Sequence, residues 1–276
     1  MFKKLGLIRF LVGAVLLIFF FTSVDRVELK KALSMVSWES LLFLVVLQVI
    51  TVLLGTWLLN WLLSREGIQV EFKQCLLINL VGIFLDNLTP GAKLGGEGAR
   101  FFLFRNLTQA KVSELVKVLL LQKVIVLLPL ILLSAFSWLD VKVNILLGFV
   151  CLLLAGRKFI IPFCLAIGIW LLYLGKIVII ARESGVYLVV LSLAQVCFPA
   201  YLLGMLPITP GGLGIFEVFF AKLLVKAGAL WEQAGAMLLI YRLVTYLLPT
   251  LWGIIAGLMI WGKVGIKDGF NGNETR

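Results

Sequence analysis

The chain has 276 residues, of which 62% are hydrophobic and only 14% are charged. A soluble globular domain is about 45–50% apolar and about 25% charged, so this composition excludes an ordinary soluble protein. The net charge of +11 is spread over short segments between apolar runs, as the positive-inside rule and anionic lipid headgroups favour, and this distribution excludes a nucleic-acid-binding protein. The sequence predicts an all-α polytopic membrane protein.

Histidine, the commonest metal ligand and general base, is absent from the sequence. The cysteines lie singly in apolar stretches without a CxxC pair, which favours buried, unreactive thiols over disulfides or metal ligands. We therefore expect no metal and no cofactor. The four cysteines are Cys75, Cys151, Cys164 and Cys197.

Apolar runs of about 20 residues, the length that crosses a bilayer, begin at the N-terminus. Residues 5–24 follow basic residues as in a signal peptide, but no small-residue cleavage site comes after them, so we expect a retained first helix. Residues 38–63 form the second expected span. The next run, 74–85, is about 18 Å long as a helix, short of the roughly 30 Å hydrocarbon core. It ends at Asp86 and Asn87.

Two related segments interrupt the apolar pattern: LTPGAKLGGEGAR, which begins at Leu88, and ITPGGLGIFE, which begins at Ile208. In each, Thr-Pro-Gly is followed six residues later by a glutamate, Glu97 or Glu217. Proline removes a backbone donor and glycine tolerates strained dihedrals, so both segments stop a helix. In hydrocarbon such breaks persist only where they pack in protein or face a water-filled cavity. We predict that each break is the tip of a re-entrant helical hairpin.

The remaining apolar runs complete the expected architecture. Residues 115–136, 141–155 and 159–180 follow the first break, residues 186–206 and 216–225 flank the second, and residues 234–261 contain Pro249. These runs give about six to eight membrane segments in one integral membrane domain, residues 1–265, with a polar tail at 266–276. The first repeat spans about 38–136 with its break at 89–97, and the second about 159–262 with its break at 209–217.

Basic residues set the expected orientation, because Lys3, Lys4 and Arg9 place the N-terminus in the cytoplasm. Two crossings then bring the first hairpin in from the cytoplasmic side, and three more bring the second in from the opposite side. The repeats are therefore expected to be inverted, with both termini cytoplasmic and the protein in the cell membrane. Broken helices in two inverted halves predict a binding site at the membrane midplane. The alternative is that the glycines only let helices pack closely.

Ionisable residues in the apolar segments mark the candidate substrate-binding site, because a charge at the centre of a membrane helix costs at least about 2.5–3.5 kcal/mol and is usually paired and functional. Arg100 shares a helical face with Glu97. Arg242 has no acid nearby in sequence, and Glu217 is the partner that we expect. The expected substrate-binding residues are Asp86, Thr89, Gly91, Lys93, Glu97, Arg100, Lys123, Thr209, Gly211, Gly212, Glu217 and Arg242.

Other interpretations of these polar residues stay open. The charged residues are alternatively ion pairs that only fix helix register. Asp86 and Arg105 alternatively lie at the membrane interface, and Lys123 alternatively extends its ammonium to the interface. Five amides are more typical of interhelical hydrogen bonds than of substrate ligands: Gln48, Asn60, Asn79, Asn87 and Gln195.

Three motifs carry a resemblance to a known family. Pro-Gly-Gly-Leu-Gly-x-x-Glu at 210–217, Leu-Ile-Tyr-Arg-Leu-x-Thr-Tyr-x-x-Pro at 239–249 and Gly-Gly-Glu-Gly-Ala-Arg at 95–100 resemble the lysylphosphatidylglycerol synthase transmembrane-region family. That family includes the flippase half of the bacterial multiple peptide resistance factor and stand-alone proteins of unknown substrate. The resemblance covers nearly the whole chain and implies an inverted-repeat lipid translocase with re-entrant helices around a central cavity. Two-domain members carry an aminoacyl-transferase after the membrane region, whereas this sequence ends at Arg276, so lipid aminoacylation is not expected.

The expected function is that of a membrane lipid transporter or flippase for a lipid with an anionic phosphate headgroup. Arg100, Arg242 and the hairpin amides hold the phosphate, while Glu97 and Glu217 hold cationic headgroup parts or the arginines. The sequence has no Walker A motif, so transport is expected to be downhill or coupled to an ion gradient, with protonation of Glu217 or Glu97 as a coupling hypothesis.

We expect no enzymatic activity, but two other classes of function stay open. One is a non-transporting membrane partner or anchor of a separate lipid-modifying enzyme. The other is an intramembrane enzyme on lipid-linked substrates, with Glu97 or Glu217 as general base. A homodimer is compatible with the sequence, which does not specify it.

Overall fold

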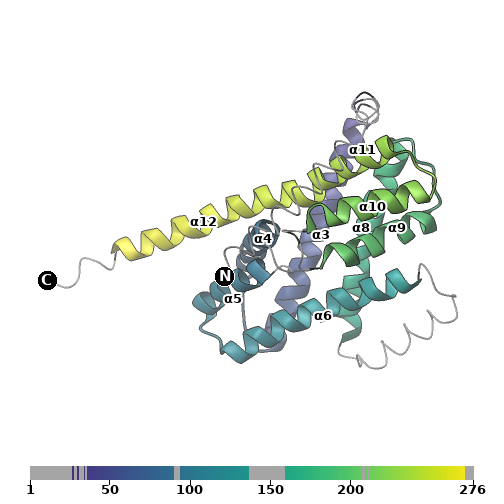
Figure 1. Ribbon diagram of the computed structural model, residues 1–276. Helices are drawn as coiled ribbons and strands as arrows, with labels where there is room; N and C mark the ends of the chain where they lie inside the picture. Colours follow the sequence, from purple (N-terminus) through teal and green to yellow (C-terminus); the bar gives the residue numbers. More distant parts are fainter. Residues whose placement is uncertain are drawn as a thin grey trace, which may run out of the picture.

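The computed structural model describes residues 36–89, 94–136, 159–206, 209 and 212–270, together with the single residues 27, 30 and 34. The expected helices at 5–24 and 141–155 lie outside the described residues, as do residues 271–276. Every element in the described ranges is a helix, which confirms the expected helical class (Figure 1).

The helices agree with most of the apolar runs to within a few residues. α9 begins later than the run at 186, because residues 186–189 do not form a helix. The last helix continues to Phe270, beyond the expected start of the polar tail at 266. In chain order the elements are α3 (Trp38–Arg65), α4 (Phe72–Leu88), α5 (Leu94–Thr108), α6 (Val112–Phe136), α8 (Ile160–Glu183), α9 (Val190–Gly204), α10 (Ile215–Lys226), α11 (Trp231–Arg242), a π-helical turn (Leu243–Leu247) and α12 (Leu248–Phe270).

Within the described part of the chain, four helical stretches are long and apolar enough to cross a membrane: Trp38–Arg65, Val112–Ala135, Ile160–Glu183 and Trp231–Trp261. Their outer faces carry large apolar side chains, such as Leu120, Leu258 and Trp261. Apolar surface this extensive is unfavourable in water and favourable against lipid tails. Cys75 and Cys197 are buried, as expected, but the expectation is wrong for Cys164 of α8, which is exposed, and Cys151 lies outside the described residues.

The last apolar run is not one continuous α-helix. α11 ends at Arg242, and the π-helical turn follows it, with the Leu248 N–H donating to the Leu243 carbonyl. Pro249 has no N–H to offer the preceding turn, and it lies at the start of α12, where that loss is tolerated. π-helical turns are frequent at functional sites, and this one directly follows a charged residue inside the membrane.

Short helices pack in pairs around the two breaks. α4 packs against α5, and α9 packs against α10. α12 lies along α4 and projects beyond the other helices (Figure 1). Gly253 allows this close approach, because a Cβ there would collide with the Leu80 carbonyl and lie 2.5 Å from Cβ of Phe84.

Buried apolar side chains form two clusters that hold these pairs in place. One cluster joins α8, α9, α10 and α11 and includes Phe216, Phe220 and Tyr241. The other joins α3, α4 and α6 to α5. Trp170 of α8 donates to the Val126 carbonyl of α6 at 2.8 Å, which ties these two helices together.

Candidate functional site

Arg100 lies in the middle of a polar group beside the first break, here called the first centre (Asn79, Asp86, Glu97, Arg100 and Lys123). Its Nη1 donates to Asp86 Oδ2 and Glu97 Oε1, both at 3.1 Å, and its Nε donates to Asn79 Oδ1 at 3.1 Å. Lys123 Nζ lies 3.9 Å from Glu97 Oε1. The side chain of Asp86 is only 8% exposed. The approach of α5 therefore buries Asp86 against Arg100.

Two glycines make room for the first centre. A Cβ on Gly82 would lie 2.5 Å from Nε of Arg100. A Cβ on Gly96 would collide with the Gly82 carbonyl and lie 2.5 Å from Asp86 Oδ1. The Gly96 N–H instead donates to that carboxylate at 3.1 Å, as a free amide in the first turn of a helix favours. The sequence Gly95-Gly96 thus lets α5 begin directly against α4.

The second centre consists of Glu217, Arg242 and the rings of Phe216 and Tyr246. Arg242 Nε donates to Glu217 Oε1 at 2.6 Å, and the Gly214 N–H donates to Glu217 Oε2 at 2.7 Å. The guanidinium carbon lies 4.7 Å from the Phe216 ring centre and 5.2 Å from that of Tyr246. The predicted pairing of Arg242 with Glu217 is confirmed.

The backbone of the second break needs glycine at the described positions. Gly212 has φ +71° and Gly214 has φ +84°, values that side-chain-bearing residues rarely adopt. A Cβ on Gly212 would also collide with the Gly204 carbonyl at the end of α9. These two residues return the chain so that α10 begins with Glu217 in its first turn.

A hydrogen-bonded bridge connects the two centres. Asn87, the neighbour of Asp86, donates through Nδ2 to Thr250 Oγ1 at 2.8 Å. Its carbonyl accepts from the Tyr246 hydroxyl at 2.8 Å. Because the Tyr246 ring faces Arg242, the end of α4 at the first break contacts the residues that surround the second.

The charged side chains of the centres differ in exposure. Lys123 is 35% exposed, Arg242 21% and Glu97 18%, whereas the inner group of Asp86, Arg100 and Glu217 lies between 4% and 8%. Arg100 of the inner group donates to Glu97, and Glu217 accepts from Arg242. Exposure therefore separates the predicted charged residues that the structure describes into an outer and an inner group.

The other predicted site residues divide into three kinds. The Thr89 hydroxyl donates to the Leu85 carbonyl at 2.6 Å, so this side chain turns back onto α4. Thr209 is 2% exposed, and no described residue hydrogen-bonds to its hydroxyl. Three predicted residues lie outside the described part of the chain: Gly91, Lys93 and Gly211.

Three of the predicted amides, Gln48, Asn79 and Asn87, make interhelical hydrogen bonds, whereas Asn60 donates to the Val70 carbonyl between α3 and α4 at 2.9 Å. Asn79 donates to Thr56 Oγ1 at 3.0 Å while it accepts from Arg100, and Asn87 forms the bridge to α12. Gln48 accepts from Lys176, which is not among the predicted site residues. Lys176 is 0% exposed in α8. The sequence does indicate Lys176, because it is a charged residue within an apolar span, the same property that makes Lys123 a candidate.

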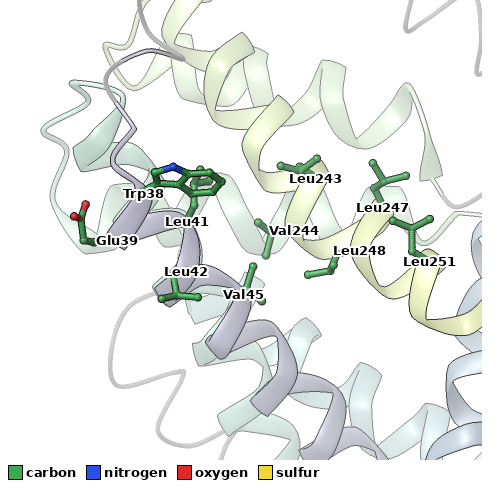
Figure 2. A pocket seen from close by; sticks show the side chains of 10 residues that line it. All are labelled: Trp38, Glu39, Leu41, Leu42, Val45, Leu243, Val244, Leu247, Leu248 and Leu251. Carbon is green, nitrogen blue, oxygen red and sulfur yellow. The ribbon is translucent and has the colours of Figure 1, made fainter. Parts of the chain in front are cut away.

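An apolar groove of about 650 Å³ runs beside the second centre, between the start of α3 and the π-helical turn. Figure 2 shows Val45 of α3 facing Val244 and Leu248, with the carboxylate of Glu39 turned away from the leucines. Leu243 lines the groove directly after Arg242. The groove therefore begins at the residue that follows Arg242 in the chain, although Arg242 itself does not line it.

Long apolar helices, outer faces suited to lipid tails and two ion-paired centres beside broken helices define an integral membrane protein with polar sites inside its helical bundle. The model of the family described as lysylphosphatidylglycerol synthase TM region matches residues 6–156 and 136–253. The chain belongs to this family, as its three motifs predicted.

Two comparisons with curated relatives agree with this membership. A protein of Methanothermobacter thermautotrophicus called UPF0104 membrane protein is 30% identical over 116 residues, which cover 42% of this chain and 33% of the relative. A second match of the same name and organism is 20% identical over 323 residues, covering 92% of this chain and 95% of the relative. The chain thus spans a third of the first relative and nearly all of the second. Both names describe membrane proteins.

Proposed function

We propose that this protein is a lipid transporter or flippase that moves a lipid with an anionic phosphate headgroup across the bilayer. The observation that carries the proposal is Arg242, which is 21% exposed while the buried carboxylate of Glu217 holds its Nε. A guanidinium offers five N–H donors and suits phosphate oxygens. Charges at membrane depth usually mark a substrate pathway.

The breaks are proposed to form re-entrant hairpins in two inverted repeats. α4 has 17 residues and α9 has 15, which give helices of about 26 and 22 Å, shorter than a hydrocarbon core of about 30 Å. Each packs against the helix that follows its break. These lengths and contacts support a chain that enters and leaves on the same side. In this arrangement both termini are cytoplasmic and the protein lies in the cell membrane.

The outer and inner charged groups take different roles in this proposal. Arg242 and Lys123 contact the phosphate, and Glu97 contacts cationic parts of the headgroup. The inner group holds the outer one in place through the hydrogen bonds of both centres. The positive and negative groups of each centre balance, Arg242 against Glu217 and two cations against two carboxylates, which allows a headgroup to leave again after binding.

The apolar groove gives the lipid tail a place beside the headgroup. Its lining from Leu243 to Leu251 follows Arg242 along one face of the π-helical turn and α12. A phosphate at the guanidinium therefore directs the attached acyl chain along apolar side chains rather than through the polar centres.

Native mass spectrometry of the gently purified protein tests lipid binding. We compare the parent with Arg242→Gln and with the matched control Lys117→Gln, which removes a positive charge from a side chain that is 62% exposed and away from both centres. One phosphate-bearing lipid class retained by the parent and the control, and lost from the Arg242 variant, supports the proposal. Equal lipid retention by all three folded proteins contradicts it and favours a non-transporting membrane partner.

A flipping assay then tests transport itself. The parent is reconstituted into vesicles of equimolar phosphatidylethanolamine and phosphatidylglycerol with a trace of fluorescent phosphatidylglycerol, and dithionite reports the outer leaflet. Faster exchange than in protein-free vesicles, slowed by Arg242→Gln and not by Lys117→Gln, is the expected result. A new lipid product in these vesicles would instead indicate an intramembrane enzyme.

A further inference from the structure

Lys176 is a fully buried amine that neither centre includes. It lies in the middle of α8, and its Nζ donates to Gln48 Oε1 at 2.5 Å and to Thr51 Oγ1 at 3.1 Å, both on α3. The Nζ also lies 4.1 Å from the centre of the Tyr173 ring. These neighbours are neutral. Their oxygens accept hydrogen bonds from the amine, but they offer no negative charge to balance an ammonium.

The absence of an acid distinguishes Lys176 from the other buried cations. Arg100 and Arg242 each hold carboxylates, whereas no carboxylate of the described residues lies within 4.0 Å of Lys176 Nζ. An unpaired buried charge is costly, and a lysine can release its proton where an arginine cannot. A neutral amine still has two N–H donors, which match the two oxygens on α3.

The groups around Lys176 come from α3, α8 and α9. α3 contributes Gln48 and Thr51, and α8 itself contributes Tyr173. α9 contributes the buried thiol of Cys197, which packs in the same cluster as Trp170 and Ile177 of α8. α6 and α11 also pack on α8, but the α6 cation Lys123 lies at Glu97 in the first centre and the α11 cation Arg242 lies at Glu217 in the second. Only thiol and phenol groups therefore accompany the amine, and no stronger acid competes for its proton in the described part of the structure.

A continuous aromatic cluster connects Lys176 to the second centre. The Tyr173 ring lies 5.2 Å from that of Tyr201, and the Tyr201 ring lies 5.0 Å from that of Phe216. Phe216 is the ring that faces the Arg242 guanidinium. The hydroxyls of Tyr201 and Tyr241 also share a hydrogen bond. The amine and the outer arginine thus contact opposite ends of one packed group of rings.

We propose that Lys176 binds and releases the proton that couples lipid transport to a proton gradient, a role that rests on the proposed transport function. The amine takes a proton from water on one side of the membrane to become an ammonium, and returns it to water on the other side. Arg242 is already paired with Glu217, so a phosphate bound there adds negative charge at the end of the cluster opposite Lys176, and this favours the protonated amine. By linkage, protonation of Lys176 then favours phosphate binding, and lipid and proton move in the same direction.

The flipping vesicles described above test this coupling with a pH difference across the membrane. One pH unit corresponds to 1.36 kcal/mol, so with one proton per lipid the parent is expected to shift the leaflet ratio of fluorescent phosphatidylglycerol by up to about tenfold. Lys176→Met is expected to keep downhill exchange and lose the shift. Lys176→Gln, which retains N–H donors for α3, gives the same result if the methionine variant fails to fold. The control Lys222→Met, at an exposed lysine of α10, keeps the shift.

The outcomes separate this inference from the proposed function. A parent that exchanges lipid without responding to the gradient overturns the role of Lys176 and leaves transport intact. A gradient response that survives in both folded Lys176 variants also overturns it, and directs attention to Glu97 and Glu217. A parent that exchanges no lipid overturns the transport proposal together with this one.

Discussion

Replacement of Arg100 by methionine tests the first centre most directly. The change removes three hydrogen bonds at 3.1 Å and leaves two carboxylates, Asp86 and Glu97, facing the same space. Removing one partner of a buried pair typically costs about 3–5 kcal/mol. The side chains of Arg100 and Asp86 are only 7% and 8% exposed, so solvent screens the lost interaction little, and we expect a loss of unfolding free energy in that range.

A double-mutant cycle isolates the pair. Arg100→Met, Asp86→Asn and the double variant are unfolded at equilibrium in mixed micelles of dodecyl maltoside and sodium dodecyl sulfate, followed by tryptophan fluorescence. We expect an interaction energy of about 1–3 kcal/mol, with the double variant more stable than the sum of the single changes implies. The matched control is Lys117→Met with Glu66→Gln, a pair at 2.8 Å whose lysine is 62% exposed, for which less than about 1 kcal/mol is expected.

The result that would refute this reasoning is a cost for Arg100→Met no larger than for Lys117→Met. In that case water reaches the first centre, and Arg100 belongs with the outer, ligand-contacting groups rather than with the supporting ones. The lipid profile of Arg100→Met would then have to change as that of Arg242→Gln does.

Three further predictions concern the packing of the broken helices. Tyr246→Phe removes the hydroxyl that donates to the Asn87 carbonyl. We expect the free energy of unfolding to fall by about 1 kcal/mol and lipid flipping to slow. An unchanged flipping rate would show that the bridge does not connect the centres functionally. Gly253→Ala is expected to cost about 1–3 kcal/mol, whereas Gly257→Ala, whose Cβ would meet its nearest neighbour at 3.8 Å, should be neutral or stabilising; equal unfolding midpoints would contradict the close contact of α12 with α4. Gly212→Ala is expected to lower the free energy of unfolding by more than about 1 kcal/mol, because φ at this position is +71° and a Cβ would collide with the end of α9. Unchanged thermal unfolding would contradict this backbone geometry.

Much of the helical architecture could be predicted because the bilayer imposes simple requirements on the sequence. The lengths of the apolar runs predict α3, α6 and α8, and the positions of the Thr-Pro-Gly segments predict where α4 and α9 end. The partner of Arg242 was predictable because a charge inside the membrane needs one, and Glu217 was the acid beside a break. These inferences depend on local composition and on the cost of an unpaired charge.

Other features depend on contacts between distant parts of the chain. The sequence leaves Asp86 either in the binding site or at the membrane interface, because its burial depends on how closely α5 packs on α4. The bridge from Asn87 to Tyr246 joins residues 159 positions apart, and no pattern in either segment indicates it. The π-helical turn has the same apolar composition as the helices around it. Lys176 is different: its position in an apolar span was visible, but its neutral surroundings were not.

The unequal exposure of the charged groups has an evolutionary consequence. Because Asp86, Arg100 and Glu217 support the bundle while Glu97, Lys123 and Arg242 face the accessible side, selection for a new headgroup acts on one set and selection for folding on the other. Under the proposed transport function, a few outer substitutions are therefore expected to change the cargo and keep the same scaffold. The inner set is where divergence should be slowest.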